Sequence, residues 1–252
     1  MMTHSRVVAI VQARMSSSRL AGKVLEPIQG EPMLAWVVDR SRLAKMVDEV
    51  VVATSLDDAD IPIVNLCKLK EYPCYRGDAT DVLDRIWKTA HAYKADVIVR
   101  ITADCPLIDP DLIDATVETL MGSDPGVDFA TTRLPWQRTY PIGLDVEACT
   151  RKVLEIAWQE AREPHQREHV MPYVYENPDR FSIVQLNAEH DYGNLRWTVD
   201  TKEDLEFVRE IAARLPNSSS FRWRDILTLL EENPELKAIN ASVEHKTHRD
   251  VE

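Results

Sequence analysis

The chain has no hydrophobic run long enough to cross a membrane. Across its 252 residues, no apolar stretch approaches the roughly 18 residues that a spanning helix needs. The first residues also lack the pattern of a secretory signal peptide, because the apolar run that begins at Val7 is short and leads into Arg14. We therefore expect a cytoplasmic protein with no membrane partner.

Cysteine is scarce, and its spacing does not predict a metal site. The four cysteines form no CxxC pair and lie apart in apolar surroundings, which predicts reduced, mostly buried thiols: Cys67, Cys74, Cys105 and Cys149. The seven histidines form no HExxH motif, and no GxSxG nucleophile motif is present. His165 and His169 are spaced four residues apart, which suits a metal, but we interpret them as one partly exposed helix face.

The chain also lacks the basic excess of a nucleic-acid-binding protein. Its formal net charge is −12, which argues against a general nucleic-acid partner. The first 45 residues have the opposite balance, with basic residues outnumbering acidic ones. A local cationic site in an acidic protein favours a small anionic ligand, because fields are focused in clefts.

The stretch from Val7 to Leu25 is the most informative part of the sequence. It begins with the apolar run 7–11, typical of a strand that is buried on both faces. A polar loop with small residues and cations follows, and it contains Gln12, Arg14, Ser16, Ser17, Ser18, Arg19, Gly22 and Lys23. Such a loop suits a polyanion such as a nucleoside triphosphate. It matches neither GxxxxGK[ST] nor GxGxxG, which disfavours a P-loop kinase and a dehydrogenase.

Apolar runs and helical patterns alternate along the first 120 residues. We expect strands at 7–11, 49–55, 72–75, 96–102, 127–132, 143–148, 180–186 and 195–199, and helices at 32–44, 57–70, 79–93, 150–163, 167–176, 202–214 and from about 221 to 230. This order predicts an α/β fold with a mostly parallel central sheet and helices on both faces. We expect one domain over residues 1–240, with an inserted lobe at about 130–190, a candidate lid at 133–143 and a polar tail at 241–252.

Two aspartates follow predicted strands at what we expect to be the same sheet edge. Asp104 follows the strand 96–102, and Asp200 follows the strand 195–199. One or two carboxylates together with phosphate oxygens are the usual protein site for Mg²⁺. Asp200 also suits a helix N-cap, and Asp104 suits a turn, so both structural roles stay open. A basic loop with two such aspartates is typical of phosphoryl or nucleotidyl transfer.

The sequence resembles the cytidylyltransferases that activate acidic sugars, over about residues 5–210. It is most similar to the spore-coat polysaccharide (SpsF-like) branch, which is related to CMP-KDO and CMP-sialic acid synthetases. The segments that carry the likeness are QARMSSSRLAGKVL (12–25), RGDATDVLDR (76–85), RITADCPLIDP (100–110), YPIGLDVE (140–147), REHVMPYV (167–174) and RWTVDTKEDLEFV (196–208). The resemblance implies a Rossmann-like nucleotidyltransferase fold and transfer of CMP from CTP to a sugar, with Mg²⁺ as cofactor and pyrophosphate as product. It also implies a homodimer.

The resemblance assigns roles to particular residues. Arg14, Lys23 and Asp104 become the catalytic residues, and Asp104 and Asp200 the metal ligands. The implied nucleotide contacts are Gln12, Ala13, Arg14, Ser16, Arg19, Lys23, Arg76, Asp78 and Asp81. The implied sugar contacts are Asp145, Glu147, Arg167 and His169.

This chain departs from the pattern of the branch at three small residues. Ser16, Ala21 and Ala103 stand where glycine or proline is usual. Three alternatives therefore stay open: a nucleotidyltransferase for another triphosphate or acceptor, a glycosyltransferase of similar fold, and a non-catalytic nucleotide-binding protein. The sequence does not name the sugar.

Overall fold

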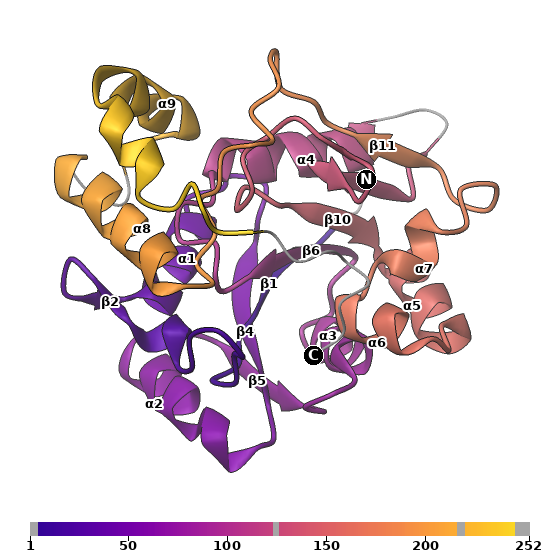
Figure 1. Cartoon of the computed structure of the whole chain (residues 1–252). Helices are drawn as coiled ribbons and strands as arrows, with labels where there is room; N and C mark the ends of the chain where they lie inside the picture. Colours follow the sequence, from indigo (N-terminus) through magenta and orange to yellow (C-terminus); the bar gives the residue numbers. More distant parts are fainter. Residues whose placement is uncertain (1–4, 123–125, 216–219, 245–252) are drawn as a thin grey trace.

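Helices cover both faces of a seven-stranded sheet in the computed structural model (Figure 1), which describes residues 5–122, 126–215 and 220–244. The strands lie in the order β11-β7-β10-β6-β1-β4-β5. Their bounds are β1 Val7–Gln12, β4 Glu49–Ser55, β5 Cys74–Gly77, β6 Val97–Thr102, β7 Phe129–Thr131, β10 Glu147–Thr150 and β11 Ile183–Gln185. Strand β10 pairs antiparallel with β6 and β7, and all other pairs in this sheet are parallel, as predicted for a mostly parallel sheet.

The alternating side chains of the strands build two cores. In β1, Val7, Ala9 and Val11 point to one core, and Val8 and Ile10 point to the other. The first core is closed by α1 Met33–Ser41, α2 Ile61–Leu69, α4 Pro110–Gly122, α8 Lys202–Arg214 and α9 Trp223–Glu232. The second is closed by α3 Val82–Ala92, α5 Arg151–Glu160 and α7 Pro172–Tyr175, while α6 Pro164–His169 packs against α3.

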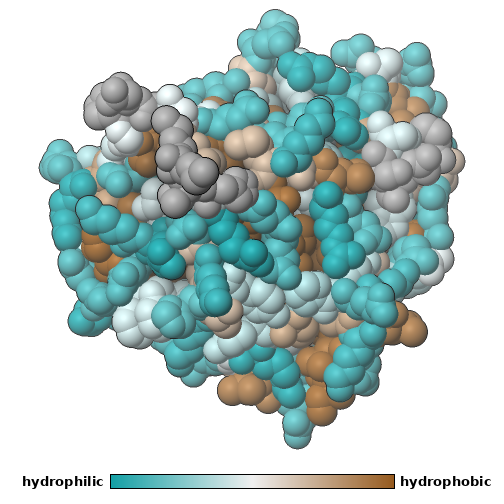
Figure 2. Space-filling view, turned by 180° about the vertical axis from the view of Figure 1, so that it is seen from behind, coloured by the Kyte–Doolittle hydropathy of each residue, from teal (hydrophilic) through white to brown (hydrophobic). Residues whose placement is uncertain are grey.

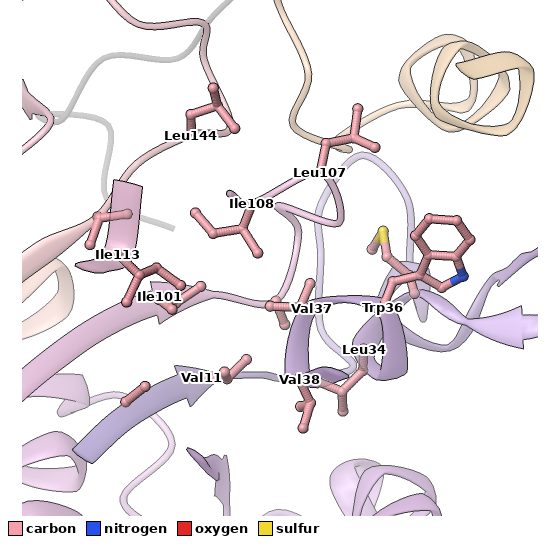
Figure 3. Close-up of a cluster of buried hydrophobic side chains, with 14 of the residues drawn as sticks. Val11, Leu34, Trp36, Val37, Val38, Ile101, Leu107, Ile108, Ile113 and Leu144 are labelled. Atoms are coloured by element: carbon pink, nitrogen blue, oxygen red, sulfur yellow. The ribbon is translucent and has the colours of Figure 1, made fainter. Parts of the chain in front are cut away.

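The first core also supports the loops that leave the sheet. Figure 3 shows Val11 of β1 and Ile101 of β6 near Val37 and Val38 of α1, with Ile108 above them. These side chains are almost completely buried, so the ends of β1 and β6 rest on a closely packed layer. Side chains that follow these strands therefore start from a rigid base.

The remaining elements are short. They are the hairpin strands β2 Pro27–Ile28, β3 Glu31–Pro32, β8 Arg133–Leu134 and β9 Gln137–Arg138, and the 3-10 turns η1 Lys23–Leu25, η2 Asp58–Asp60 and η3 Pro234–Ala238. The predicted lid at 133–143 thus contains the hairpin β8–β9. Of the predicted tail, residues 245–252 lie outside the described residues.

The predicted strand at 195–199 is wrong. This segment makes only one isolated bridge, between Ile142 and Arg196, and joins none of the named strands. The amide of Trp197 donates instead to the carbonyl of Ile142, and the amide of Val199 donates to the carbonyl of Asp104. The segment is apolar because it is buried under the loops at the sheet edge. An apolar pattern in the sequence is the same for such a segment as for a strand that is hydrogen-bonded within the sheet.

The predicted helix at 167–176 is wrong in its extent. The structure has two short helices there, α6 and α7, separated at Val170, whose φ of 74° cannot continue a helix. Pro172 then starts α7. The strand expected at 143–148 begins later, at Glu147, because Gly143 turns the chain with a φ of 104°.

The cysteine prediction is confirmed. All four thiols are free, and three of them are buried, as the sequence predicted.

The helices and the surface bear on the expectation that no segment crosses a membrane. Among the described residues, no helix is long and apolar enough to span a bilayer. The face shown in Figure 2 is mainly hydrophilic.

Candidate functional site

A cavity of about 280 Å³ opens where the carboxyl ends of β1 and β6 meet. Strand β1 supplies Gln12, the loop that follows it supplies Ala13 and Arg14, and the segment after β6 supplies Asp104. Such an edge is where parallel α/β sheets bind their ligands. The cavity also includes the predicted residues Ser16, Lys23, Asp145, Glu147, His169 and Asp200.

Lys23 holds Asp104 and Asp200 together. Its Nζ atom donates to Asp200 Oδ1 at 2.7 Å, to Asp104 Oδ2 at 3.0 Å and to the carbonyl of Val199 at 2.8 Å. The residue is only 8% exposed. Burial lowers the pKa of Lys23, but the charges of Asp104 and Asp200 outweigh it and raise the pKa above its ordinary value. Lys23 is therefore a buried ammonium group that is fully charged at neutral pH.

Asp200 is surrounded by cations. Besides Lys23, it accepts from Arg19 at 2.8 Å and from Arg196 at 2.6 Å. Burial raises its pKa, but Lys23 and then Arg19 and Arg196 outweigh this effect and lower the pKa to about 2. Asp200 is consequently an ionised carboxylate, as a metal ligand must be.

The N-cap of α8 is Thr201 and not Asp200, for which capping was the alternative role. The hydroxyl of Thr201 accepts from the amide of Asp204, and Asp204 completes a capping box at the start of α8. Asp204 also pairs with Arg196 at 2.9 Å, so the cap and the cation beside Asp200 form one network. For Asp104, the turn role coexists with the contact to Lys23.

The oxygen atoms around Lys23 suit a hard divalent cation. Two carboxylates and one carbonyl already surround a single positive charge, and Mg²⁺ prefers oxygen ligands, usually one or two carboxylates with phosphates and water. Asp104 and Asp200 are thus a chemically suitable pair for the predicted Mg²⁺. Within residues 5–122, 126–215 and 220–244, no cluster of three or more His, Cys, Asp and Glu side chains is arranged for a metal.

A buried acid fixes the start of the polar loop that follows β1. Asp60 accepts from the amide of Met15 at 2.6 Å and from the amide and hydroxyl of Ser55. Burial raises its pKa, but the hydrogen bond from Met15 and those from Ser55 and Thr54 outweigh it, so the pKa lies below its ordinary value. Further along the loop, Gly22 adopts a φ of 72°, which turns the chain so that Lys23 enters the cavity.

The opposite wall of the cavity consists of paired charges. Glu147 accepts from Arg100 at 2.5 Å, and Arg100 also donates to Gln12 at 2.8 Å. Asp145 accepts from both terminal nitrogens of Arg138, at 2.5 and 3.1 Å. This wall lies on the β10 side of β6, away from the loop that carries Lys23.

Five predicted contacts lie outside the residues that line this cavity. Arg76 donates to the carbonyls of Ser55 and Asp57, and Asp78 accepts from the amides of Thr80 and Asp81 in a turn. Asp81 caps α3 and pairs with Arg167. Arg19 reaches the site through its ion pair with Asp200.

Sequence reasoning missed several residues of the cavity. They include Arg85, Arg100, Arg133, Glu168 and Thr198. Arg100 interrupts an otherwise apolar buried strand, and Arg85 falls within the inward stripe of its helix. For both arginines, a charged residue at a position where the pattern predicts a buried apolar one could have indicated the site.

The comparisons with known proteins agree with this geometry. A family model described as "Cytidylyltransferase" matches residues 8–244. The spore coat polysaccharide biosynthesis protein SpsF of Bacillus subtilis is 31% identical over 236 residues, which is 91% of this chain and 95% of SpsF.

Two solved structures have the same fold. A cytidylyltransferase from Leptospira borgpetersenii is 32% identical with a TM-score of 0.89, covering 96% of this chain and 100% of that one. A CMP:2-keto-3-deoxy-manno-octonic acid synthetase complexed with CTP is 23% identical with a TM-score of 0.66, covering 83% and 99%. The fold is therefore that of the nucleotidyltransferases, and the chain belongs to the cytidylyltransferase family.

Proposed function

We propose that this cytidylyltransferase transfers CMP from CTP to a hydroxyl group of an acidic sugar, with Mg²⁺ as cofactor and pyrophosphate as product. The observation that carries the proposal is the contact of Lys23 with Asp104 and Asp200 at the edge where β1 and β6 end. The relative solved with CTP acts, by its title, on a sugar acid, which supports the choice of both substrates.

The reaction needs positioning and charge more than a covalent nucleophile. The sugar hydroxyl attacks the α-phosphorus and releases its proton to water, a P–O bond forms, and the bond from the α-phosphorus to the bridging oxygen breaks, releasing pyrophosphate. Arg14 and Lys23 lie at the cavity to neutralise the triphosphate and the leaving group. Asp104 and Asp200 would hold Mg²⁺, which supplies positive charge beside the phosphate oxygens when bound.

The paired charges near β10 suit the sugar. Glu147 and Asp145 are fixed by Arg100 and Arg138, so their remaining oxygen lone pairs have defined positions for sugar hydroxyl groups. We also propose a homodimer that works in the cytoplasm. Light scattering on the purified protein tests the dimer.

Pyrophosphate release tests the reaction. We expect release with CTP, Mg²⁺ and one class of acidic sugar among the four nucleoside triphosphates and a panel of acidic and neutral sugars. Asp104→Asn should lower kcat by roughly 100-fold or more, because a charge-stabilising group is lost. Asp111→Asn is the control, since its side chain is 61% exposed and pairs with Arg222 outside the cavity. Near wild-type turnover by Asp104→Asn would refute the assignment, and consumption of a nucleotide-sugar without pyrophosphate would indicate a glycosyltransferase.

A further inference from the structure

Arg85 is a buried cation whose hydrogen bonds leave part of the guanidinium unused. It lies on α3, lines the cavity and is only 1% exposed. Its Nη1 atom donates to the carbonyls of Asp78 at 2.5 Å and Ala79 at 3.4 Å. The buried Nε atom has no acceptor among the residues that the structure describes.

The unused edge has the geometry of an oxyanion receptor. Within the described ranges, neither Nε nor Nη2 of Arg85 donates a hydrogen bond, and together they form one side of the planar guanidinium. Two parallel N–H groups on such an edge match two oxygens of a carboxylate or a phosphate. A buried donor without an acceptor is costly, and folded proteins seldom keep one without a use.

Arg85 differs in this respect from the other arginines of the cavity. Arg100 pairs with Glu147 at 2.5 Å, Arg133 with Asp145 at 3.6 Å, and Arg14 with Glu168 at 3.7 Å. No carboxylate in the described part of the chain lies within 4 Å of the Arg85 nitrogens. Burial, followed by the charge of Arg14, lowers its pKa to about 10, so the group is still charged at neutral pH.

The stem of Arg85 is held in place by close packing against the end of β5. A Cβ atom placed on Gly77 would lie 2.8 Å from Arg85 Cγ and 3.3 Å from its Cα, so the chain here accommodates only glycine. The carbonyls of Asp78 and Ala79 then fix one side of the guanidinium. The unused edge is consequently preorganised, which lowers the cost of ligand binding.

We propose that Arg85 binds an oxyanion of a substrate through its Nε–Nη2 edge. This inference rests on the proposed function and adds a residue to it. The shared chemistry is a pair of adjacent anionic oxygens, which either the triphosphate or the carboxylate of the sugar acid can supply.

Binding measurements on the full chain distinguish these sources. Calorimetry compares wild type, Arg85→Lys and Arg85→Gln with four probes: inorganic pyrophosphate, CTP, cytidine and 3-deoxy-manno-octulosonate. Arg85→Lys keeps the charge but lacks the two-nitrogen edge. If Arg85 contacts the triphosphate, we expect both variants to lower the affinity for pyrophosphate and CTP by roughly 10- to 100-fold. If it contacts the carboxylate of the sugar acid, we expect the same loss of affinity for 3-deoxy-manno-octulosonate. The affinity for cytidine should be unchanged in either case.

Arg40→Lys is the matched control for the loss of a buried guanidinium. Arg40 is fully buried on the other face of the sheet and donates to the carbonyls of Ile108 and Phe221, so its replacement changes stability and should leave all four affinities unchanged. Thermal unfolding of each variant verifies that it is folded.

Two results would overturn the inference. One is unchanged affinity of folded Arg85 variants for all the anionic probes, and the other is a loss for cytidine as large as that for CTP, which would make Arg85 a reader of the base. Failure of wild type to bind CTP would instead contradict the proposed function, while pyrophosphate binding would still test Arg85.

Discussion

Replacing Lys23 by methionine tests the centre of the site most directly. Methionine keeps an unbranched side chain of similar length but removes the ammonium group, which contacts Asp104, Asp200 and the carbonyl of Val199 within 3.0 Å. The change leaves two carboxylates close together without the cation between them. We expect a lower free energy of unfolding and a stronger affinity for divalent metal.

The size of the stability loss follows from burial. Removing one partner of a buried ion pair costs about 3–5 kcal/mol. Here the side chains of Asp104 and Asp200 are 26% and 16% exposed, so water relieves part of the repulsion. Arg19 and Arg196 also remain beside Asp200. We therefore expect a loss of about 2–3 kcal/mol in urea denaturation at pH 7, somewhat below the range for fully buried pairs.

Lys88→Met is the matched control. Lys88 pairs with Asp84 at 2.8 Å, but its side chain is 49% exposed, and such surface pairs contribute about 0–1 kcal/mol. If Lys23→Met lost no more stability than Lys88→Met, the idea that Lys23 holds the two aspartates would be refuted.

Manganese binding without nucleotide, measured by electron paramagnetic resonance, gives a second readout for Lys23→Met. The ammonium group and a divalent cation compete for the same carboxylates, so the variant should bind Mn²⁺ more tightly than wild type. Equal affinity would show that Lys23 does not occupy the place of the metal.

Two further substitutions test the frame of the site. Asp60→Asn should lower the free energy of unfolding by about 1–3 kcal/mol at pH 7, because the ionised side chain accepts from the amide of Met15. Since the folded-state pKa of Asp60 is lowered, the stabilisation by its carboxylate is present above the unfolded pKa of about 3.9 and is lost as the pH falls. The difference in free energy of unfolding between the variant and wild type, measured by urea denaturation, should therefore shrink from pH 5 to pH 3. A constant difference would contradict this. Gly143→Ala should cost about 3 kcal/mol or more, because a Cβ atom there would lie 2.5 Å from the backbone nitrogen of Thr198. Gly30→Ala is its control in thermal unfolding, since Gly30 also has a positive φ but has no atom within 4 Å of the added Cβ, and equal losses would mean that strain rather than the clash decides the result.

The location of the site was predictable because parallel strands determine it. Runs of β-branched residues indicate the buried strands β1 and β6, and the side chains that follow such strands gather at one edge. Lys23 and Asp104 are thus brought together from positions 81 residues apart in the sequence. The family resemblance, which the family model confirms, led to the same edge.

Asp200 reached this edge by a route that the sequence pattern did not indicate. The segment before it, 195–199, is apolar enough for a strand, yet it crosses the ends of the strands and bonds to the loops there. An apolar pattern indicates that a segment is buried, and it does not indicate which elements cover that segment. The position of Asp200 was obtained in spite of this error because the segment still ends beside Asp104.

Acidic residues in turns were the least predictable from sequence. Asp78 and Asp81 occur in a motif of the resemblance, and the structure uses them to close a turn and to cap α3. Aspartate serves caps, turns and ligands with the same oxygens, so its type does not separate these roles. Arg85 shows the converse, since it occurs in the same motif without a predicted role and only the three-dimensional structure reveals its unused edge.

The charges that line the cavity limit how it can accept a triphosphate. Its residues comprise the cations Arg14, Lys23, Arg85, Arg100 and Arg133 and the acids Asp104, Asp145, Glu147, Glu168 and Asp200, so positive and negative side chains are equal in number. The cationic loop predicted from sequence is therefore largely neutralised by acids from distant parts of the chain. A nucleoside triphosphate needs an excess of positive charge, and the side chains of the cavity do not provide one. Our proposals supply it from two sources: a divalent cation that arrives with the nucleotide and competes with Lys23 for the aspartates, and Arg85, the cation without an acid partner.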